Sequence, residues 1–253
     1  MAALFAAAMT VQAAPARASA GVTVEGTSFH VTESGGTVLD QASLPGTILT
    51  LGDGGDAHRR IRIDAVERDA RDAGGELVLY TLSEQDPATG AWVNACMPDP
   101  DGRRLGFPLA GAFTPDGVYQ PRHNGILITC TGGAEGKCVR FGYQPWHPDL
   151  LPYYQACVRL VRADYGGDGI GHTRNGMPID LFDRIGIQAD EPAHGMTLEA
   201  AFGTDGAVCV AHTRLPDTTL EELRHHYPRL AGHVGSACDD HAPALLFVRS
   251  FPP

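Results

Sequence analysis

The most regular pattern in the sequence is an alternation of apolar and polar positions in the first half of the chain. Ile61 and Ile63 alternate with Arg60 and Arg62, which is typical of a strand that buries one of its faces. Similar strand patterns follow at residues 77–82, 91–95, 106–113, 125–131 and 137–143. A turn sequence at 86–90 separates the first two of these, so we expect antiparallel hairpins arranged as a meander.

The spacing changes near residue 148, where apolar residues begin to recur every three or four positions. Leu150, Tyr154, Cys157 and Val161 follow this spacing, which predicts an amphipathic helix. Pro148 precedes the segment and two glycines at 166–167 follow it, as expected for the two ends of a helix. We therefore expect one central helix with Cys157 on its apolar side.

The last third of the chain predicts further strands and one short helix. Apolar segments typical of strands lie at residues 179–182, 197–202, 207–213 and 244–248. Thr218 and Glu221 have the spacing of a capping box, which predicts a short C-terminal helix that ends before Pro228. The expected fold class is therefore α+β and β-dominant, with antiparallel hairpins, one central amphipathic helix and one short C-terminal helix.

Residues 1–20 resemble a secretion signal. A short apolar run from Ala2 to Val11 is followed by small residues, with Ala-x-Ala triplets up to Ala20. The usual basic residues before the apolar run are missing, because Arg17 is the first basic residue. Either the true start lies upstream of Met1, or the run is an alanine-rich tail.

Two further regions follow this segment. In residues 21–56 a Gly-Thr pair recurs at Gly26, Gly36 and Gly46, which indicates a β leader with turns at these positions, or a simple glycine-rich leader. We expect residues 57–253 to form one β-rich domain.

The six cysteines predict a set of disulfide bonds. They lie at positions 96, 130, 138, 157, 209 and 238, an even set without the close pairs that a zinc site normally uses. Cys130 and Cys138 flank a glycine-rich link and are the best local pair. The alternative is a cytosolic chain with free, buried thiols.

Composition and charge exclude some classes of function. The chain has 253 residues with 43% hydrophobic content, which is enough for one large domain or two small ones. Asp and Glu number 30 against 19 Lys and Arg, a formal net charge of −11, so we expect no nucleic acid partner. No apolar stretch reaches the length of about 18 residues that a transmembrane segment needs.

One block of the sequence is similar to a known family. The segments Cys138-Val-Arg-Phe-Gly-Tyr-Gln-Pro-Trp146, Gln155-Ala-Cys-Val-Arg-Leu-Val-Arg-Ala-Asp-Tyr165 and Ile179-Asp-Leu-Phe-Asp-Arg-Ile-Gly-Ile-Gln188 resemble the ADYC domain of bacterial exported proteins. The resemblance places an ADYC-like core at about 138–213. It implies an exported domain and supplies no catalytic residues.

The chain departs from the family pattern at one place. Ala163-Asp164-Tyr165 is followed by Gly166 where the family has cysteine. The resemblance also implies a second cysteine just before Pro228, where this chain has Tyr227. This chain would then lack both partners of one disulfide bond, as expected if that bond has been lost as a unit.

The polar segment between Asp164 and Asp183 is the first candidate for a site. Asp164 and Asp168 fit part of a calcium loop, so calcium is the cofactor that this segment could bind. Gly166 and Asn175 stand where that loop needs oxygen ligands. The favoured interpretation is therefore a turn in which the two aspartates bind local amides, with no metal and no cofactor.

Cysteine catalysis is a second candidate. It would use Cys157 with His172 or His194, oriented by Asp180. Cys157 lies well inside its predicted helix, where the helix end does not lower the pKa of a thiol. A disulfide or core role for Cys157 is favoured.

A structural network is the third interpretation of this segment. Arg159 and Arg162 are neighbours on the predicted helix. We expect them to pair with Asp180 or Asp183 and to fix the helix to the strand that follows.

Together these patterns predict an exported protein, periplasmic or secreted, that acts as a non-enzymatic structural or binding module of the cell envelope. Its partner is unknown. The alternative is a hydrolase or metal-dependent enzyme with a site around residues 164–183, using His172, Asp164 and Asp168.

Overall fold

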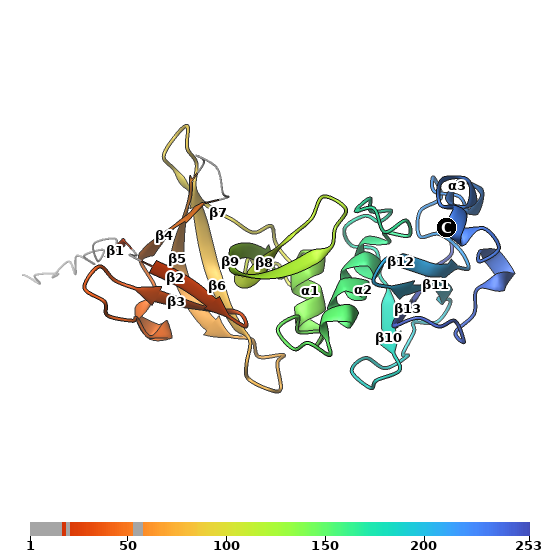
Figure 1. The fold of residues 1–253 in the computed structure, drawn as a ribbon, viewed down its shortest axis with the longest axis horizontal. Helices are drawn as coiled ribbons and strands as arrows, with labels where there is room; N and C mark the ends of the chain where they lie inside the picture. Colours follow the sequence, from red (N-terminus) through yellow and green to blue (C-terminus); the bar gives the residue numbers. More distant parts are fainter. Residues whose placement is uncertain (1–16, 19–20, 53–57) are drawn as a thin grey trace, which may run out of the picture.

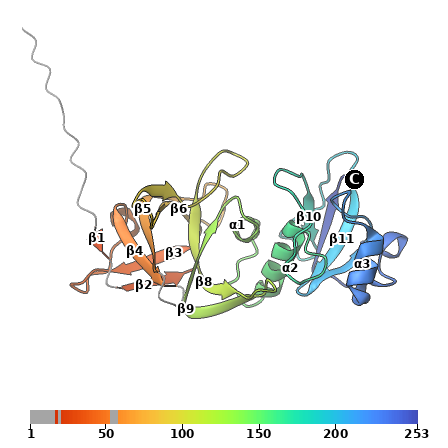
Figure 2. The ribbon, with the colours of Figure 1, turned by 90° about the horizontal axis from the view of Figure 1, so that it is seen from above.

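The computed structural model describes residues 17–18, 21–52 and 58–253 of the chain. Of the predicted secretion signal, only Arg17 and Ala18 belong to the described residues. The chain forms two lobes, with a β-rich lobe at the N-terminal side and a smaller sheet with a flanking helix at the C-terminal side (Figure 1). Helices α1 and α2 lie between the two groups of strands (Figure 2).

The first lobe contains the first nine strands. They are β1 (Arg17–Ala18), β2 (Gly21–Glu25), β3 (Ser28–Thr32), β4 (Thr47–Gly52), β5 (His58–Arg68), β6 (Val78–Gln85), β7 (Trp92–Asn94), β8 (Gly106–Phe113) and β9 (Tyr119–Cys130), with a short 3-10 helix at Gln41–Ser43. One sheet has the order β1-β4-β5-β6-β8-β9, with β7 paired to β6. All its pairs are antiparallel except β1 with β4, so the predicted meander is present.

Strand β5 shows why this sheet forms. Ile61 and Ile63 are fully buried, whereas Arg60 before them is exposed and Arg62 between them is half-buried, which confirms the predicted alternation. Ile61 is opposite Leu49 of β4, and Leu49 is also fully buried. Strands β4 and β5 lie on either side of the predicted boundary between the leader and the domain, and they pair with each other.

The β2–β3 hairpin packs against this sheet through its apolar side. Phe29 and Val31 of β3 are fully buried. The backbone N–H of Phe29 donates to the hydroxyl of Tyr80 on β6, at 3.0 Å, and burial raises the pKa of Tyr80 to about 12. The hairpin is thus joined to the larger sheet by a buried polar contact as well as by apolar packing.

The second lobe combines helices with a smaller sheet. Its elements are α1 (Ala134–Arg140), α2 (Leu151–Arg162), β10 (Asp180–Asp183), β11 (Thr197–Gly203), β12 (Gly206–Val210), α3 (Leu220–His226) and β13 (Leu246–Ser250), with 3-10 helices at Pro228–Leu230 and Gly235–Ala237. The sheet has the order β10-β13-β11-β12 and is antiparallel throughout. The β-dominant α+β fold class is confirmed.

The predicted central helix is α2. Tyr154, Cys157 and Val158, which follow its apolar spacing, are buried. Every other residue from 154 to 160 is buried as well, so the middle of the helix is covered on all sides. The helix ends at Ala163, whose φ of 51° lies in the left-handed region. This turn brings Asp164 back beside the last turn of α2, where its N–H donates to the carbonyl of Arg159.

The two lobes are connected through the β8–β9 hairpin. The side chain of Gln155 on α2 accepts a hydrogen bond from the N–H of Tyr119 at 2.7 Å and donates to the carbonyl of Gly117 at 2.8 Å. Arg159 donates to the carbonyl of Asp116 in the same hairpin. Because one helix satisfies backbone groups of the other lobe, the hairpin and α2 are held together.

Two of the predicted elements are wrong in type or position. Residues 137–143 were expected to form a strand, but 134–140 form α1, which places Cys138 beside α2, where it bonds to Cys157. The capping box lies one residue later than predicted, at Thr219 and Glu222.

All six cysteines form disulfides, so the predicted disulfide set is confirmed. The bonds are Cys96–Cys130, Cys138–Cys157 and Cys209–Cys238. The predicted Cys130–Cys138 pair is wrong. Cys130 ends β9 and bonds to the segment after β7, whereas helix α1 carries Cys138 away to α2.

Candidate functional site

The aspartates of the predicted loop are bound by the protein itself. Asp164 is 1% exposed and accepts hydrogen bonds from the N–H groups of Gly167 and Gly169, at 2.8 and 3.0 Å. Asp168 accepts from the N–H of Ile170 and from the hydroxyl of Tyr227. The interpretation of a turn that binds local amides is therefore confirmed. Within the described residues, no group of three or more His, Cys, Asp or Glu is placed to hold a metal ion.

The arginines of α2 have partners other than those predicted. Arg159 forms a buried ion pair with Asp164, at 2.5 Å, because the left-handed turn at Ala163 returns Asp164 to the helix. Arg162 donates to the carbonyl of Gly169. The predicted pairing with Asp180 or Asp183 is wrong.

The predicted acidic partners on β10 have other neighbours. Asp183 accepts a hydrogen bond from the hydroxyl of Tyr143 at 2.7 Å. Burial alone would raise the pKa of Asp183, but this bond and backbone N–H donors outweigh burial and lower it. Asp180 lies beside Asp190 and its pKa is raised, first by burial and then by the charge of Asp190.

A second buried network was not predicted. The guanidinium of Arg214 binds both carboxylate oxygens of Glu199 at 2.9 Å, and the two side chains are 1% and 0% exposed. Tyr165 donates its hydroxyl to Glu199, and Arg214 also donates to the carbonyls of Leu160 and Val161 at the end of α2. No spacing in the sequence connects these residues, which come from separate segments. Their contacts are satisfied inside the protein, so we assign them to scaffolding.

The candidates for cysteine catalysis do not form a catalytic arrangement. Cys157 is bonded to Cys138, so the disulfide interpretation of Cys157 is confirmed and its sulfur is not a free nucleophile. His172 bonds to Thr218 at 3.1 Å and stacks on Tyr165. It borders a cavity of about 520 Å³, while His194 is exposed.

Three adjacent cavities instead meet at Lys137, and we call them together the Lys137 groove. Their volumes are about 400, 600 and 220 Å³, and Lys137 borders all three. The walls are the segments 95–101 and 130–133 of the first lobe, helix α1, and the loop 173–177 of the second lobe. The groove thus lies where the two lobes meet and has the size of a small-molecule site.

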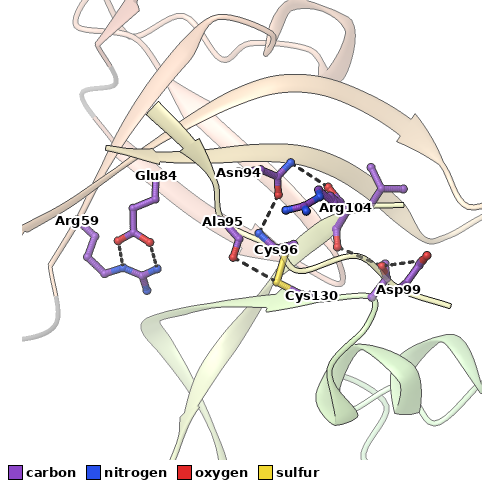
Figure 3. The surroundings of a disulfide bond; sticks show 10 residues. Arg59, Glu84, Asn94, Ala95, Cys96, Asp99, Arg104 and Cys130 are labelled. Carbon is purple, nitrogen blue, oxygen red and sulfur yellow. Dashed lines mark hydrogen bonds and ion pairs between the residues drawn. A yellow bond between two sulfur atoms is a disulfide. The ribbon is translucent and has the colours of Figure 1, made fainter. Parts of the chain in front are cut away.

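Two of the three disulfides hold the walls of this groove. Cys96–Cys130 fixes the segment after β7 to the end of β9 (Figure 3). Cys138 is adjacent to Lys137 in sequence, and its bond to Cys157 fixes α1 to α2. Covalent crosslinks on both sides make the groove walls stiffer than loops of the same length would be.

Hydrogen bonds of Asp99 shape the first wall further. Its carboxylate accepts from the N–H groups of Asp101 and Arg103 and from the hydroxyl of Thr131, at 2.9 to 3.1 Å. Burial acts to raise the pKa of Asp99, but these bonds and the nearby charge of Arg140 lower it overall. The carboxylate is therefore occupied by its own loop, by Thr131 and by the guanidinium of Arg140 at 3.8 Å.

Lys137 has an exceptional place in this chain. It is the one lysine in the sequence, and within the described residues its side chain has no hydrogen bond or ion pair. Sequence reasoning missed it because charge counting combined lysine with arginine. Because the sequence has no other lysine, counting lysine separately from arginine would have drawn attention to this residue.

No helix within the described residues is long and apolar enough to cross a membrane. Searches of curated proteins and of solved structures gave no match to this chain. A family model, the ADYC domain, matches residues 41–216, which include the segments that form the Lys137 groove. The match covers more than half of the sequence, and the chain belongs to the ADYC domain family.

Proposed function

We propose that this protein is an exported binding module whose ligand occupies the Lys137 groove. The observation that carries the proposal is the position of the disulfides, two of which fix the walls of the groove. A binding site gains affinity when its walls are ordered before the ligand arrives. The walls that the disulfides fix are the ones that a ligand in the groove would contact.

The cysteine chemistry supports export to the periplasm or beyond. All six cysteines are paired, and disulfides persist in oxidising compartments, whereas cytosolic thiols are kept reduced. The signal-like character of residues 1–20 points the same way.

A binding role is favoured over catalysis because the two acidic residues of the predicted loop, Asp164 and Asp168, are satisfied internally. Asp164 is neutralised by Arg159, and Asp168 is held by Tyr227. A general acid, base or metal ligand needs an atom that faces the substrate. Among the charged residues that border the groove, Lys137 is the one without a partner in the described part of the chain. His172, whose Nε2 is buried without a hydrogen-bond partner, borders a separate cavity of about 520 Å³.

Binding is tested by a fragment screen of the oxidised protein, followed through its amide NMR signals. We expect hits to shift the signals of residues 95–101, 130–141 and 173–177. Asn175 is exposed and borders two of the cavities, so Asn175→Trp should block the groove and abolish these shifts. Glu221→Trp on α3, outside the groove, is the matched control and should bind as the natural protein does. Hits that survive Asn175→Trp, or no hits at all, would contradict the proposal.

Location is tested on protein isolated from its native cells. The chain is denatured without reduction and treated with an alkylating agent. We expect no modified cysteine, and the protein in the periplasmic or extracellular fraction. Six modified cysteines in the cytosolic fraction would overturn the proposed location.

A further inference from the structure

We infer that the Lys137 groove takes an amphipathic oxyanion, a carboxylate or phosphate group attached to an apolar body, with the ammonium of Lys137 binding the oxyanion. This inference rests on the proposed binding function and adds the chemical class of the ligand. Two features of the described residues lead to it: the distribution of charge in the groove and the apolar side chains that border it.

The charges around the groove are paired except at Lys137. Each arginine that borders it has an acidic partner. The pairs are Arg71–Asp101, Arg140–Asp69, Arg162–Glu135, Arg174–Asp217 and Arg214–Glu199. Lys137, in contrast, has no acidic neighbour within ion-pair distance among the described residues. The groove therefore contains one positive charge that the protein itself does not neutralise, and an anion would complete the pairing.

This pairing is notable in a chain of formal net charge −11. Acidic side chains are abundant, yet Asp99, Asp101 and Glu135, which border cavities together with Lys137, are bound elsewhere. Asp99 accepts hydrogen bonds within its own loop, and Glu135 lies 3.9 Å from Arg162. An overall negative surface keeps most anions at a distance, so binding in this groove requires a specific local contact.

A second cation, Arg174, also borders the groove. Arg174 lines the cavity of about 400 Å³ together with Lys137. Its ion pair with Asp217 is exposed, with side chains 67% and 65% accessible, and such pairs contribute little stability. Arg174 is thus free to exchange Asp217 for a ligand oxyanion.

Apolar side chains also border the groove. Met97 is 75% exposed and borders the cavity of about 600 Å³ with Pro98 and Pro100. A large apolar side chain at the mouth of a cavity is a common place for an apolar ligand group to bind. Phe141 and Met177 line the adjoining cavity of about 400 Å³. The ligand would place its oxyanion at Lys137 and its apolar body along these side chains.

The lysine itself supplies a direct test. In the intact oxidised protein, an acetylating reagent modifies the amine of Lys137 and the α-amino group of the chain, and peptide mapping separates the two. Octanoate and octyl phosphate represent the two sources of oxyanion. We expect either or both to slow acetylation of Lys137 at least about fivefold, whereas octanamide, acetate and inorganic phosphate leave the rate nearly unchanged.

Calorimetric titration of variants identifies the contact. Lys137→Gln should weaken binding of the protecting anion at least about tenfold, because a charge-assisted contact is lost. Lys137→Arg keeps the charge and should bind within about threefold of the natural protein. Arg224→Gln on α3 is the matched control and should change nothing. Thermal melts of each variant exclude loss of folding.

The outcomes separate the inference from the proposed function. Octanamide binding the groove as tightly as octanoate, or unchanged affinity in Lys137→Gln, would overturn the oxyanion class while leaving a binding groove. If neither the anions nor neutral fragments bind, both statements fail.

Discussion

Gly166 lies directly against the ring of Tyr227, so that a Cβ atom at position 166 would be 2.3 Å from the ring carbons Cε1 and Cζ. The family resemblance implies a cysteine at each of these two positions. The turn after α2 and the end of α3 therefore pack against each other in this chain, although neither position holds a cysteine. Tyr227 also donates its hydroxyl to Asp168 at 2.9 Å, and burial followed by this bond raises the pKa of Tyr227 to about 12.

The first prediction concerns this contact. Gly166→Ala should destabilise the protein by about 1–3 kcal/mol, the usual cost of overpacking, because the new methyl group overlaps the Tyr227 ring. In a Tyr227→Ala background the same change should cost much less. Denaturant unfolding of the four proteins measures the coupling, and an equal cost in both backgrounds would show that the ring is not the cause.

The second prediction separates the groove disulfide from the distant one. Cys96–Cys130 and Cys209–Cys238 span 34 and 29 residues, so replacing either pair by alanine should cost a similar amount, about 3–4 kcal/mol. The Cys96→Ala/Cys130→Ala protein should also bind groove ligands at least about fivefold more weakly, because one wall is released. The Cys209→Ala/Cys238→Ala protein is the matched control. Equal affinities in the two variants would contradict the role that we assign to the first disulfide.

The third prediction concerns the buried ion pair of Arg214 and Glu199. Arg214→Ala leaves the Glu199 carboxylate buried without its cation and should cost about 3–5 kcal/mol. Arg214→Met/Glu199→Leu removes both charges and should cost less than Arg214→Ala alone. Arg224→Ala breaks an exposed pair with Glu221 and should change the free energy of unfolding by no more than about 0.5 kcal/mol. A double variant less stable than Arg214→Ala would indicate that shape, and not charge, dominates at this position.

The fourth prediction follows from the carboxyl pair Asp180 and Asp190. The pKa of Asp180 is raised by burial and by the charge of Asp190, while bonding to Arg249 lowers the pKa of Asp190. A group whose pKa is raised by folding favours the folded state at low pH and disfavours it once the group ionises. Asp180→Asn should therefore raise the melting temperature at pH 7, since its amide can donate to Asp190.

The advantage of Asp180→Asn should fade as the pH falls below about 4, where an aspartate is protonated in both the folded and unfolded states. Glu221→Gln, at an exposed position, serves as the control across the same pH range. Lower stability of Asp180→Asn at pH 7 would contradict the raised pKa.

Periodic segments of the chain were predictable from sequence. Strand β8 occupies Gly106–Phe113, the predicted range, and α2 follows the apolar spacing around Tyr154 and Cys157. Both segments are rich in buried residues over most of their length, and a run of apolar residues bounded by turn signals marks such an element in the sequence.

Features set by contacts distant in sequence were not predictable in this way. Helix α1 has only 7 residues, too few to show a period, and its type depends on packing against α2. The partner of Cys138 depends in turn on the direction of α1, so the error in the element produced the error in the disulfide. The Lys137 groove unites segments from both lobes, and no local pattern marks such a junction.

The central claim is that a ligand binds beside Lys137, and one NMR measurement tests it most directly. Reductive methylation with ¹³C-formaldehyde keeps the charge of the chain's one lysine and gives it a single side-chain signal, distinct from that of the α-amino group. We predict that octanoate, octyl phosphate or a fragment hit shifts the Lys137 signal to saturation, and that Asn175→Trp abolishes the shift. A Lys137 signal that stays in place while the same compounds shift signals elsewhere would contradict the account.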